Sequence, residues 1–229
     1  MNVTLLSYSQ PTEEFRSQGV GDAQELIAYC ARVSNPANQF NTETSEKLIG
    51  YLVKHQHWSP LEMVSACLEI TTTRDIARQI LRHRSFSFQE FSQRYADPTA
   101  ELGEAFVLRD ARLQDTKNRQ NSVELDLVDE EARFLAAEWA RRQQEVIDLV
   151  KENYTWAIGA GIAKEQARCL LPEGNTVSRL YMNGTVRSWI HYIMLRKENG
   201  TQREHMDIAL ACAHAIAAIF PMATKMIAQ

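Results

Sequence analysis

One segment, residues 79–95, changes its residue pattern partway along and so limits how the chain around it can fold. Upstream, Arg74, Arg78 and Arg82 recur at every fourth position, which places three guanidinium groups on one face of an α-helix. Beyond Arg84 the pattern becomes the alternation typical of an extended strand. That alternation puts these side chains on one face: Phe86, Phe88, Glu90, Ser92 and Arg94. We therefore expect a helix that carries its arginines to its C-terminal end and then leads into a strand.

This segment suits a planar ligand that carries an anionic group. Arginine offers paired planar donors and stays charged at any working pH. His83 lies between Arg82 and Arg84, and like charge on both sides disfavours its protonation, so we expect a neutral imidazole. The alternative is an ordinary solvated helix face followed by a loop, and the polar groups set among aromatic residues weaken it.

The composition limits the class of protein. With 229 residues and 45% hydrophobic content the chain can bury one core, so we expect a single domain over residues 1–229. The net charge of −4 argues against a broad nucleic-acid footprint, whereas five arginines against two acids in residues 74–94 favour a small anionic ligand. The four cysteines lack Cys-x-x-Cys spacing and no stretch is long enough to span a membrane, so we expect a soluble cytoplasmic protein without membrane contact.

Local patterns predict a mixture of short strands and longer helices. Strands are expected at residues 3–8, 63–72, 105–108 and 175–182. Helices are expected at residues 22–35, 42–55, 129–153, 162–170, 183–196 and 202–220. The polar stretches are expected to form a turn region at 10–21 and an exposed, mobile loop at 109–126. Because the order lacks regular βαβ alternation, it agrees with the α+β class.

Several residues carry weaker predictions. His55 and His57 form a His-x-His pair, but no further ligand follows at a recognisable spacing, so no metal site is expected. Cys169 is expected to be a buried thiol, and the alanine-rich helix at residues 202–220 to pack closely on another helix, within the subunit or across a subunit boundary. One stripe of the helix at residues 129–153 is expected to be buried: Ala132, Leu135, Trp139, Val146 and Val150.

The segment Arg82-His83-Arg84, seven intervening residues and Ser92 resembles the signature of the flavin-dependent thymidylate synthases. The resemblance extends over residues 48–204. Further matching residues are Glu90, Arg94 and Tyr95 in the same segment, His57, Ser59 and Glu62 before it, and Arg168, Thr185, Val186 and Arg187 after it. Departures from the family pattern stand at Met63, His191 and Gly200.

The resemblance implies an α+β fold, with helices around a central and largely antiparallel sheet, assembled as a homotetramer with sites between subunits. It also implies an enzyme that methylates dUMP to dTMP, with FAD as cofactor, 5,10-methylenetetrahydrofolate as carbon donor and NADPH as reductant. The FAD-binding residues that it implies are His57, Ser59, Arg82, His83, Arg84, Glu90, Thr185, Val186, Arg187 and His191. The implied dUMP-binding residues are Gln79, Ile80, Leu81, Arg82, Glu90, Phe91, Ser92, Gln93, Arg94, Arg168 and Arg196.

Among these, Arg196 is the candidate catalytic residue. Making the pyrimidine C5 nucleophilic builds negative charge on the ring oxygens and N3, and an arginine aimed at the ring stabilises that charge. Ser92 is assigned to binding, because no histidine stands where it would prove a base for a serine nucleophile.

Two interpretations from other classes stay open on the residues alone. A non-catalytic nucleotide- or RNA-binding module could stack bases on the aromatic side chains of residues 79–95. A structural subunit could use the alanine-rich helix for assembly. The acidic net charge argues against the first, and the concentration of polar groups in one segment argues against the second.

Overall fold

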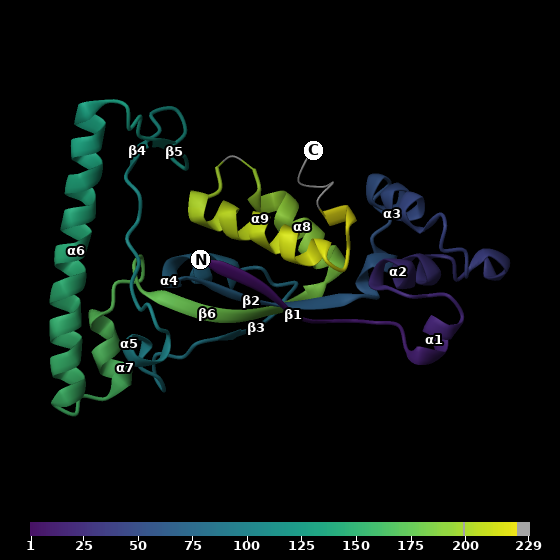
Figure 1. Ribbon diagram of the computed structural model, residues 1–229, viewed down its shortest axis with the longest axis horizontal. Helices are drawn as coiled ribbons and strands as arrows, with labels where there is room; N and C mark the ends of the chain where they lie inside the picture. The colour runs from purple at the N-terminus through teal and green to yellow at the C-terminus, as the bar shows by residue number, and fades with distance from the viewer. Residues whose placement is uncertain (199, 224–229) are drawn as a thin grey trace.

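The computed structural model describes residues 1–198 and 200–223, and a four-stranded antiparallel sheet runs through its middle (Figure 1). The strands follow the order β1-β2-β6-β3 across the sheet. Their bounds are β1 Asn2–Tyr8, β2 Ser65–Thr73, β3 Ser87–Glu90 and β6 Val177–Thr185. Each neighbouring pair is antiparallel. The predicted α+β class and antiparallel sheet are confirmed.

One face of the sheet carries the main core. Leu68 of β2 lies opposite Met182 of β6, and both side chains are fully buried. Alternate positions of β6, such as Arg179 and Asn183, are exposed. The buried face packs under the two helices α8 Val186–Arg196 and α9 Arg203–Ala217, which lie side by side over it (Figure 1). The predicted packing of the alanine-rich helix on another helix is confirmed.

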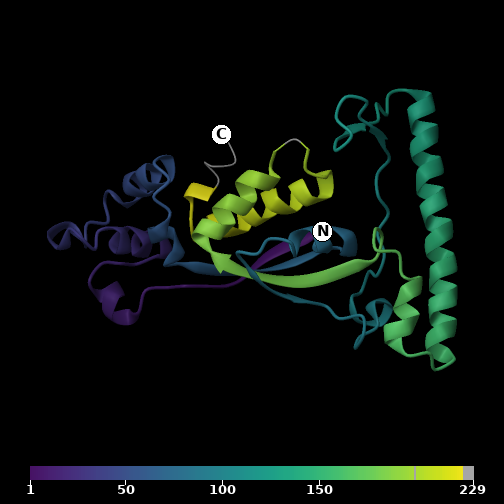
Figure 2. The same ribbon diagram turned by 180° about the vertical axis from the view of Figure 1, so that it is seen from behind.

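The first quarter of the chain forms small helices at one end of the sheet (Figure 2). Their bounds are α1 Glu13–Ser17, α2 Ala23–Ala31, η1 Pro36–Asn38, α3 Ser45–Lys54 and η2 Ser59–Glu62. The side chain of Asp22 caps α2 by accepting the backbone N–H of Glu25 at 2.7 Å. The expected turn region at 10–21 is wrong in part, because a short helix occupies Glu13–Ser17.

The opposite end of the molecule is built around one long helix (Figure 1). Its elements are α5 Pro98–Glu101, β4 Arg112–Gln114, β5 Ser122–Glu124, α6 Glu130–Gly159, α7 Lys164–Ala167 and η3 Arg168–Leu170. One strand prediction and one loop prediction are wrong here. Residues 105–108 contribute only an isolated bridge between Phe106 and Thr176, and the expected loop at 109–126 contains the β4–β5 hairpin.

The prediction of a buried apolar stripe in α6 is wrong in part, because Leu135, Trp139 and Val146 are exposed while Ala132 and Val150 are half-buried. Trp139 and Val146 are 44% and 51% exposed, whereas Gln143 and Ile147 are buried. The reason is a polar contact, since the Gln143 side chain both accepts the N–H and donates to the C=O of Arg109, each at 2.9 Å. Because these buried backbone groups need hydrogen-bond partners, the face of α6 that carries Gln143 packs against the segment around Arg109. The prediction for Cys169 is also wrong, since this thiol is exposed.

Within the described residues, no helix is both long and apolar enough to cross a membrane.

Gly184 allows a close approach of an aromatic ring to β6, which leads to a stability prediction. A Cβ at this position would lie 2.4 Å from Cδ1 of Phe86, whose ring packs at 4.7 Å from Trp189. We expect Gly184→Ala to lower the free energy of unfolding by about 1–3 kcal/mol, because the ring must leave its packed position. Urea denaturation measures this change. Gly159→Ala is the control, because its Cβ would meet nothing within 4 Å; equal losses in both variants would contradict the prediction.

Candidate active site

The turn that follows α4 (Arg74–Ile80) carries the Arg-His-Arg segment. The helix ends one residue before Leu81, and the N–H of His83 then donates to the C=O of Ile80 at 3.0 Å. Arg82 therefore lies in a turn and not on the helix, which corrects the expectation that three arginines share one helical face. The turn frees the Arg82 and Arg84 side chains, and both are exposed.

An open cleft of about 650 Å³ lies beside this turn. It brings together three of the predicted dUMP-binding residues, Gln79, Arg82 and Arg196, although Arg196 lies more than a hundred positions later in the sequence. The rest of its lining consists of Arg78, Gln120, Gly200, Thr201 and Gln202. Three arginines in one small cleft fit an anionic, oxygen-rich ligand.

His83 is joined directly to Arg196. The Nε–H of Arg196 donates to Nε2 of His83 at 3.0 Å, so this ring nitrogen carries no proton. Burial, followed by the positive charges of Arg196 and Arg82, lowers the pKa of His83 to about 4. The predicted neutral imidazole is confirmed. Its expected cause is right only in part, because burial is the largest effect.

A second group of predicted residues lies around the start of α8. Thr185 caps this helix by accepting the N–H of Ser188 at 3.3 Å, and Arg187 forms an ion pair with Glu62 of η2. The ring of His191 lies 4.4 Å from the ring of Trp58. Thr185, Arg187 and His191, all implied FAD residues, thus lie near the η2 segment that also carries Ser59.

A second hydrogen bond, besides the one between Arg196 and His83, joins the Arg-His-Arg turn to α8. The hydroxyl of Ser188 donates to the C=O of Ser85 at 3.1 Å. Val186 is buried, so it can offer a ligand only its backbone. His57 is exposed and lies 6.0 Å from the ring of Tyr51.

A third group, residues 90–94 with Arg168, lies apart from the cleft lining. Arg94 pairs with the Glu165 carboxylate at 3.5 Å, and Nε of Arg168 donates to the Glu165 backbone C=O at 3.3 Å. The side chain of Gln93 is buried, yet its amide nitrogen has no hydrogen-bond partner in the part of the chain that the structure describes. An unpaired buried amide marks a place where a ligand or a second chain can supply an acceptor.

Glu90 and the apolar members of the implied dUMP set play internal roles in this chain. Glu90 accepts from the Ser178 hydroxyl at 2.8 Å and pairs with Arg74 at 3.5 Å. Ile80 is fully buried in the core, and Leu81 and Phe91 are half-buried. Glu90 also lies 3.9 Å from Arg78 of the cleft, which links the third group to the first.

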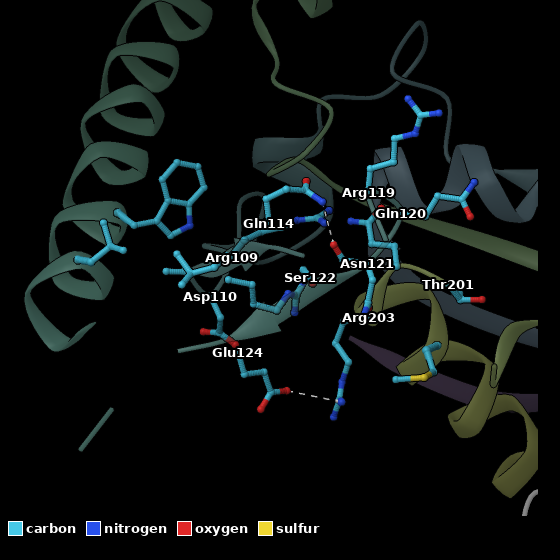
Figure 3. A pocket seen from close by; sticks show the side chains of 17 residues that line it. Arg109, Asp110, Gln114, Arg119, Gln120, Asn121, Ser122, Glu124, Thr201 and Arg203 are labelled. Atoms are coloured by element: carbon cyan, nitrogen blue, oxygen red, sulfur yellow. Dashed lines mark hydrogen bonds and ion pairs between the residues drawn. The ribbon is translucent and has the colours of Figure 1, made fainter. Parts of the chain in front are cut away.

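A second, larger cleft of about 770 Å³ adjoins the first (Figure 3). Gln120, Thr201 and Gln202 line both clefts. The β4–β5 hairpin forms one wall, where the Gln114 amide donates to the Asn121 C=O at 3.2 Å (Figure 3). Arg203, at the start of α9, reaches across to Glu124 at 3.6 Å (Figure 3).

No group of three or more His, Cys, Asp or Glu side chains in residues 1–198 and 200–223 is arranged to hold a metal ion.

Comparison with known sequences decides the family. A family model described as "Thymidylate synthase complementing protein" matches residues 18–222. The chain belongs to the flavin-dependent thymidylate synthase family. The probable flavin-dependent thymidylate synthase of Paramecium bursaria Chlorella virus 1 is 48% identical over 225 residues, which cover 98% of both chains. The flavin-dependent thymidylate synthase of Synechocystis sp. is 47% identical over 222 residues, which cover 96% of both.

Comparison of structures agrees with this assignment at the level of the fold. The UMP/dUMP methylase PolB from Streptomyces cacaoi, solved with 5-Br dUMP bound, aligns with a TM-score of 0.78 at 24% identity. The alignment covers 99% of this chain and 94% of that one. Membership of the thymidylate synthase family identifies the chain as an enzyme and favours catalysis over a non-catalytic binding module.

The structure also explains one departure from the family pattern and adds residues to the site. Gly200 has a φ of +95°, a backbone conformation that residues with a Cβ rarely adopt. Gln120 and Gln202 line the cleft but were not selected from the sequence. Gln202 lies two residues after Gly200, a departure from the family pattern, and this position could have pointed to it. Gln120 lies in a polar stretch with no helical or strand pattern, so nothing in the sequence pointed to it.

The neutral state of His83 leads to a pH prediction. Its folded pKa of about 4 lies below the ordinary value of 6.5, so the unfolded chain takes up a proton first as the pH falls. His83 should therefore reduce stability as the pH falls from about 6.5 to about 4. Histidine NMR titration should show His83 titrating near pH 4. In Arg196→Gln its pKa should rise but stay below 6.5, because burial remains; titration of wild-type His83 at 6.5 would contradict the assignment.

Proposed function

We propose that this chain methylates dUMP at C5 to form dTMP, with FAD as its cofactor, 5,10-methylenetetrahydrofolate as the carbon donor and NADPH as the reductant. The observation that carries this proposal is the meeting of Gln79, Arg82 and Arg196 in one cleft, with neutral His83 bonded to Arg196. The names of the relatives, flavin-dependent thymidylate synthases, support it.

Arg196 is the proposed catalytic residue. His83 uses only the Nε–H of this arginine, and within residues 1–198 and 200–223 both terminal nitrogens of the guanidinium remain for the pyrimidine ring. Because His83 is neutral, it does not repel Arg196 and can hold it by a hydrogen bond. A fixed guanidinium at the ring oxygens stabilises the negative charge that develops when C5 becomes nucleophilic.

Five polar residues of the dUMP set are proposed to bind the sugar and phosphate: Arg82, Glu90, Ser92, Arg94 and Arg168. Arg82 has an exposed guanidinium in the cleft, and Arg94 and Arg168 add two more cationic groups around Glu165. Glu90, held by Arg74 and Ser178, is positioned to accept a ligand hydroxyl through its remaining lone pairs. Ser92 is half-buried in the same group and is assigned to binding.

The donor set around α8 fits FAD. The N-terminus of α8, with Arg187 on it and the exposed Arg84 nearby, suits a pyrophosphate. The neighbouring rings of Trp58 and His191 can pack against a heteroaromatic ring. Ser59 begins the adjoining η2 segment, and His57 lies two residues before it. When bound, the flavin supplies the redox chemistry.

We further propose that the enzyme is a homotetramer whose sites are shared between subunits. On α6, a repeat of alternating three- and four-residue steps forms an exposed seam: Leu135, Trp139, Arg142, Val146, Leu149, Asn153 and Trp156. Such a repeat is typical of helices that pack on another helix. The unpaired Gln93 amide and the separation of the Arg94 and Arg168 group from the cleft support completion of the site by a second copy.

A cytoplasmic location is part of the same proposal. All four cysteines are free thiols in the structure, which agrees with a reducing compartment.

The function is tested by the visible absorption of the FAD-incubated protein. We expect a flavin band that bleaches with NADPH and recovers as dTMP forms from dUMP and methylenetetrahydrofolate. In Arg196→Gln, bleaching by NADPH should persist while dTMP formation falls by about 10²–10³-fold, as for loss of a donor to a developing negative charge. Arg16→Gln, on the surface of α1, is the control and should keep its activity. Failure of the wild-type protein to retain FAD would refute the proposal.

The oligomer is tested on α6. Leu149 is 60% exposed in the isolated chain. We expect Leu149→Glu to reduce the mass measured by light scattering below that of four chains, because it places a charge in an apolar contact. Gln144→Glu adds the same charge on the opposite side of α6 and should leave the mass unchanged. If the two variants have the same mass, the exposed seam of α6 does not hold the subunits together.

A further inference from the structure

A chain of hydrogen bonds runs from the buried Tyr192 and His205 through Gln79 and Gln202, which line the cleft, to Glu204. The His205 side chain is fully buried, and its two ring nitrogens each have one partner. Nε2 lies 3.2 Å from the Tyr192 hydroxyl, and Nδ1 lies 3.2 Å from Oε1 of Gln79. The Gln79 amide nitrogen lies 2.7 Å from Oε1 of Gln202, whose own nitrogen lies 3.0 Å from Glu204. Two of these residues, Tyr192 and His205, have no role in the function proposed above.

Glu204 sets the direction of every bond in this chain. Its carboxylate pairs with Arg112 and, at 3.3 Å, with Arg109. Burial alone would raise the pKa of Glu204, but hydrogen bonds from its own backbone, Arg112 and Gln202, with the charge of Arg109, outweigh burial and lower it. An ionised carboxylate can only accept hydrogen bonds. The Gln202 atom that faces it must therefore be the NH₂ group.

The remaining donors and acceptors follow one from the next. Because the Gln202 nitrogen faces Glu204, its oxygen faces Gln79, and Gln79 must present nitrogen there. The oxygen of Gln79 then faces His205, so Nδ1 of His205 must carry the proton. Nε2 is left bare and accepts from the Tyr192 hydroxyl. Reversing any one amide or the histidine tautomer would set two donors or two acceptors against each other.

The ring of His205 can hold this tautomer because it stays neutral. Burial, together with the positive charges of Arg196, His83 if protonated, and Arg82, lowers the pKa of His205 to about 3. Burial also raises the pKa of Tyr192 well above its usual value, so its hydroxyl keeps its proton. Both residues therefore keep their donor and acceptor roles across the pH range in which an enzyme works.

We propose that His205 and Tyr192 are positioning residues that fix the Gln79 carboxamide so that it presents N–H, and not C=O, to the nucleotide in the cleft. The oxygen end of Gln79 points to the fully buried His205, while its nitrogen end lies beside Gln202, which lines the cleft with it. The ligand of Gln79 is then an acceptor oxygen of dUMP, either a ring carbonyl or the phosphate. This inference rests on the proposed function.

The test compares two substitutions in the FAD-loaded protein. His205→Phe keeps a ring but removes the donor to Gln79, and should raise the Kd for dUMP, measured by calorimetry, about tenfold. His205→Asn places an amide nitrogen close to the position of Nδ1, so it should restore binding to within about threefold of wild type. Thermal melts establish that both variants are folded.

Two further ligands identify the oxygen. If His205→Phe loses the preference for dUMP over dCMP, the donor meets the C4 carbonyl of the ring, since dCMP carries an amino group in place of that oxygen. If instead it loses the preference for dUMP over deoxyuridine, the donor meets the phosphate. Either result supports the proposal. A Kd for dUMP that is unchanged in folded His205→Phe, or raised equally in both variants, would overturn it.

The tautomer of His205 tests the same proposal without any ligand. Nitrogen-15 spectra of wild type should place the His205 proton on Nδ1, and a proton on Nε2 would overturn the assignment. The two proposals fail in different ways. Wild-type protein that does not bind dUMP refutes the function and this inference with it, whereas normal dUMP binding with an Nε2–H tautomer refutes the inference alone.

Discussion

The antiparallel pairing of β6 with both β2 and β3 is the constraint on which the site depends. β6 runs into α8 without a loop, since the strand ends at Thr185 and the helix begins at Val186. The N–H of Val186 donates to the C=O of Val64 at 2.8 Å, which ties this junction to the start of β2. The position of α8, and with it that of Arg187 and Arg196, is therefore fixed by the register of the sheet. The pairing with β3 places Glu90 on the same framework.

Two carboxylates held by arginines and two neutral histidines determine the charge distribution of the candidate site. Glu90 and Glu204 are each fixed by two arginines, so these carboxylates act as acceptors of known direction. His83 and His205 are neutral because burial and neighbouring arginines both oppose a further positive charge. The result is a cleft in which cationic donors face the ligand while the supporting hydrogen bonds run behind them, out of water.

At the α6 end of the molecule a polar side chain is buried while apolar side chains of the same helix are exposed. Burying Gln143 satisfies the backbone of Arg109 and leaves an apolar seam of the same helix exposed. A single chain of this length gains nothing from an exposed seam, because burial of apolar surface is the main favourable contribution to folding. The homotetramer proposed above would bury this surface.

The sequence by itself determined the family, the α+β class and most helices, because these depend on local periodicity and on a motif that is continuous in the chain. It also indicated that His83 would be neutral. Only the tertiary structure decided which residues meet. Gln120 and Gln202 join Gln79 in the cleft through loops without a periodic pattern, and the buried face of α6 was chosen by a hydrogen bond from Gln143 to a backbone 34 residues away. The direction of the Tyr192, His205 and Gln79 bonds depends on Glu204 being ionised. The pKa of Glu204 is lowered by a hydrogen bond from its own backbone and by Arg112, Arg109 and Gln202, of which only the fold brings the two arginines to it.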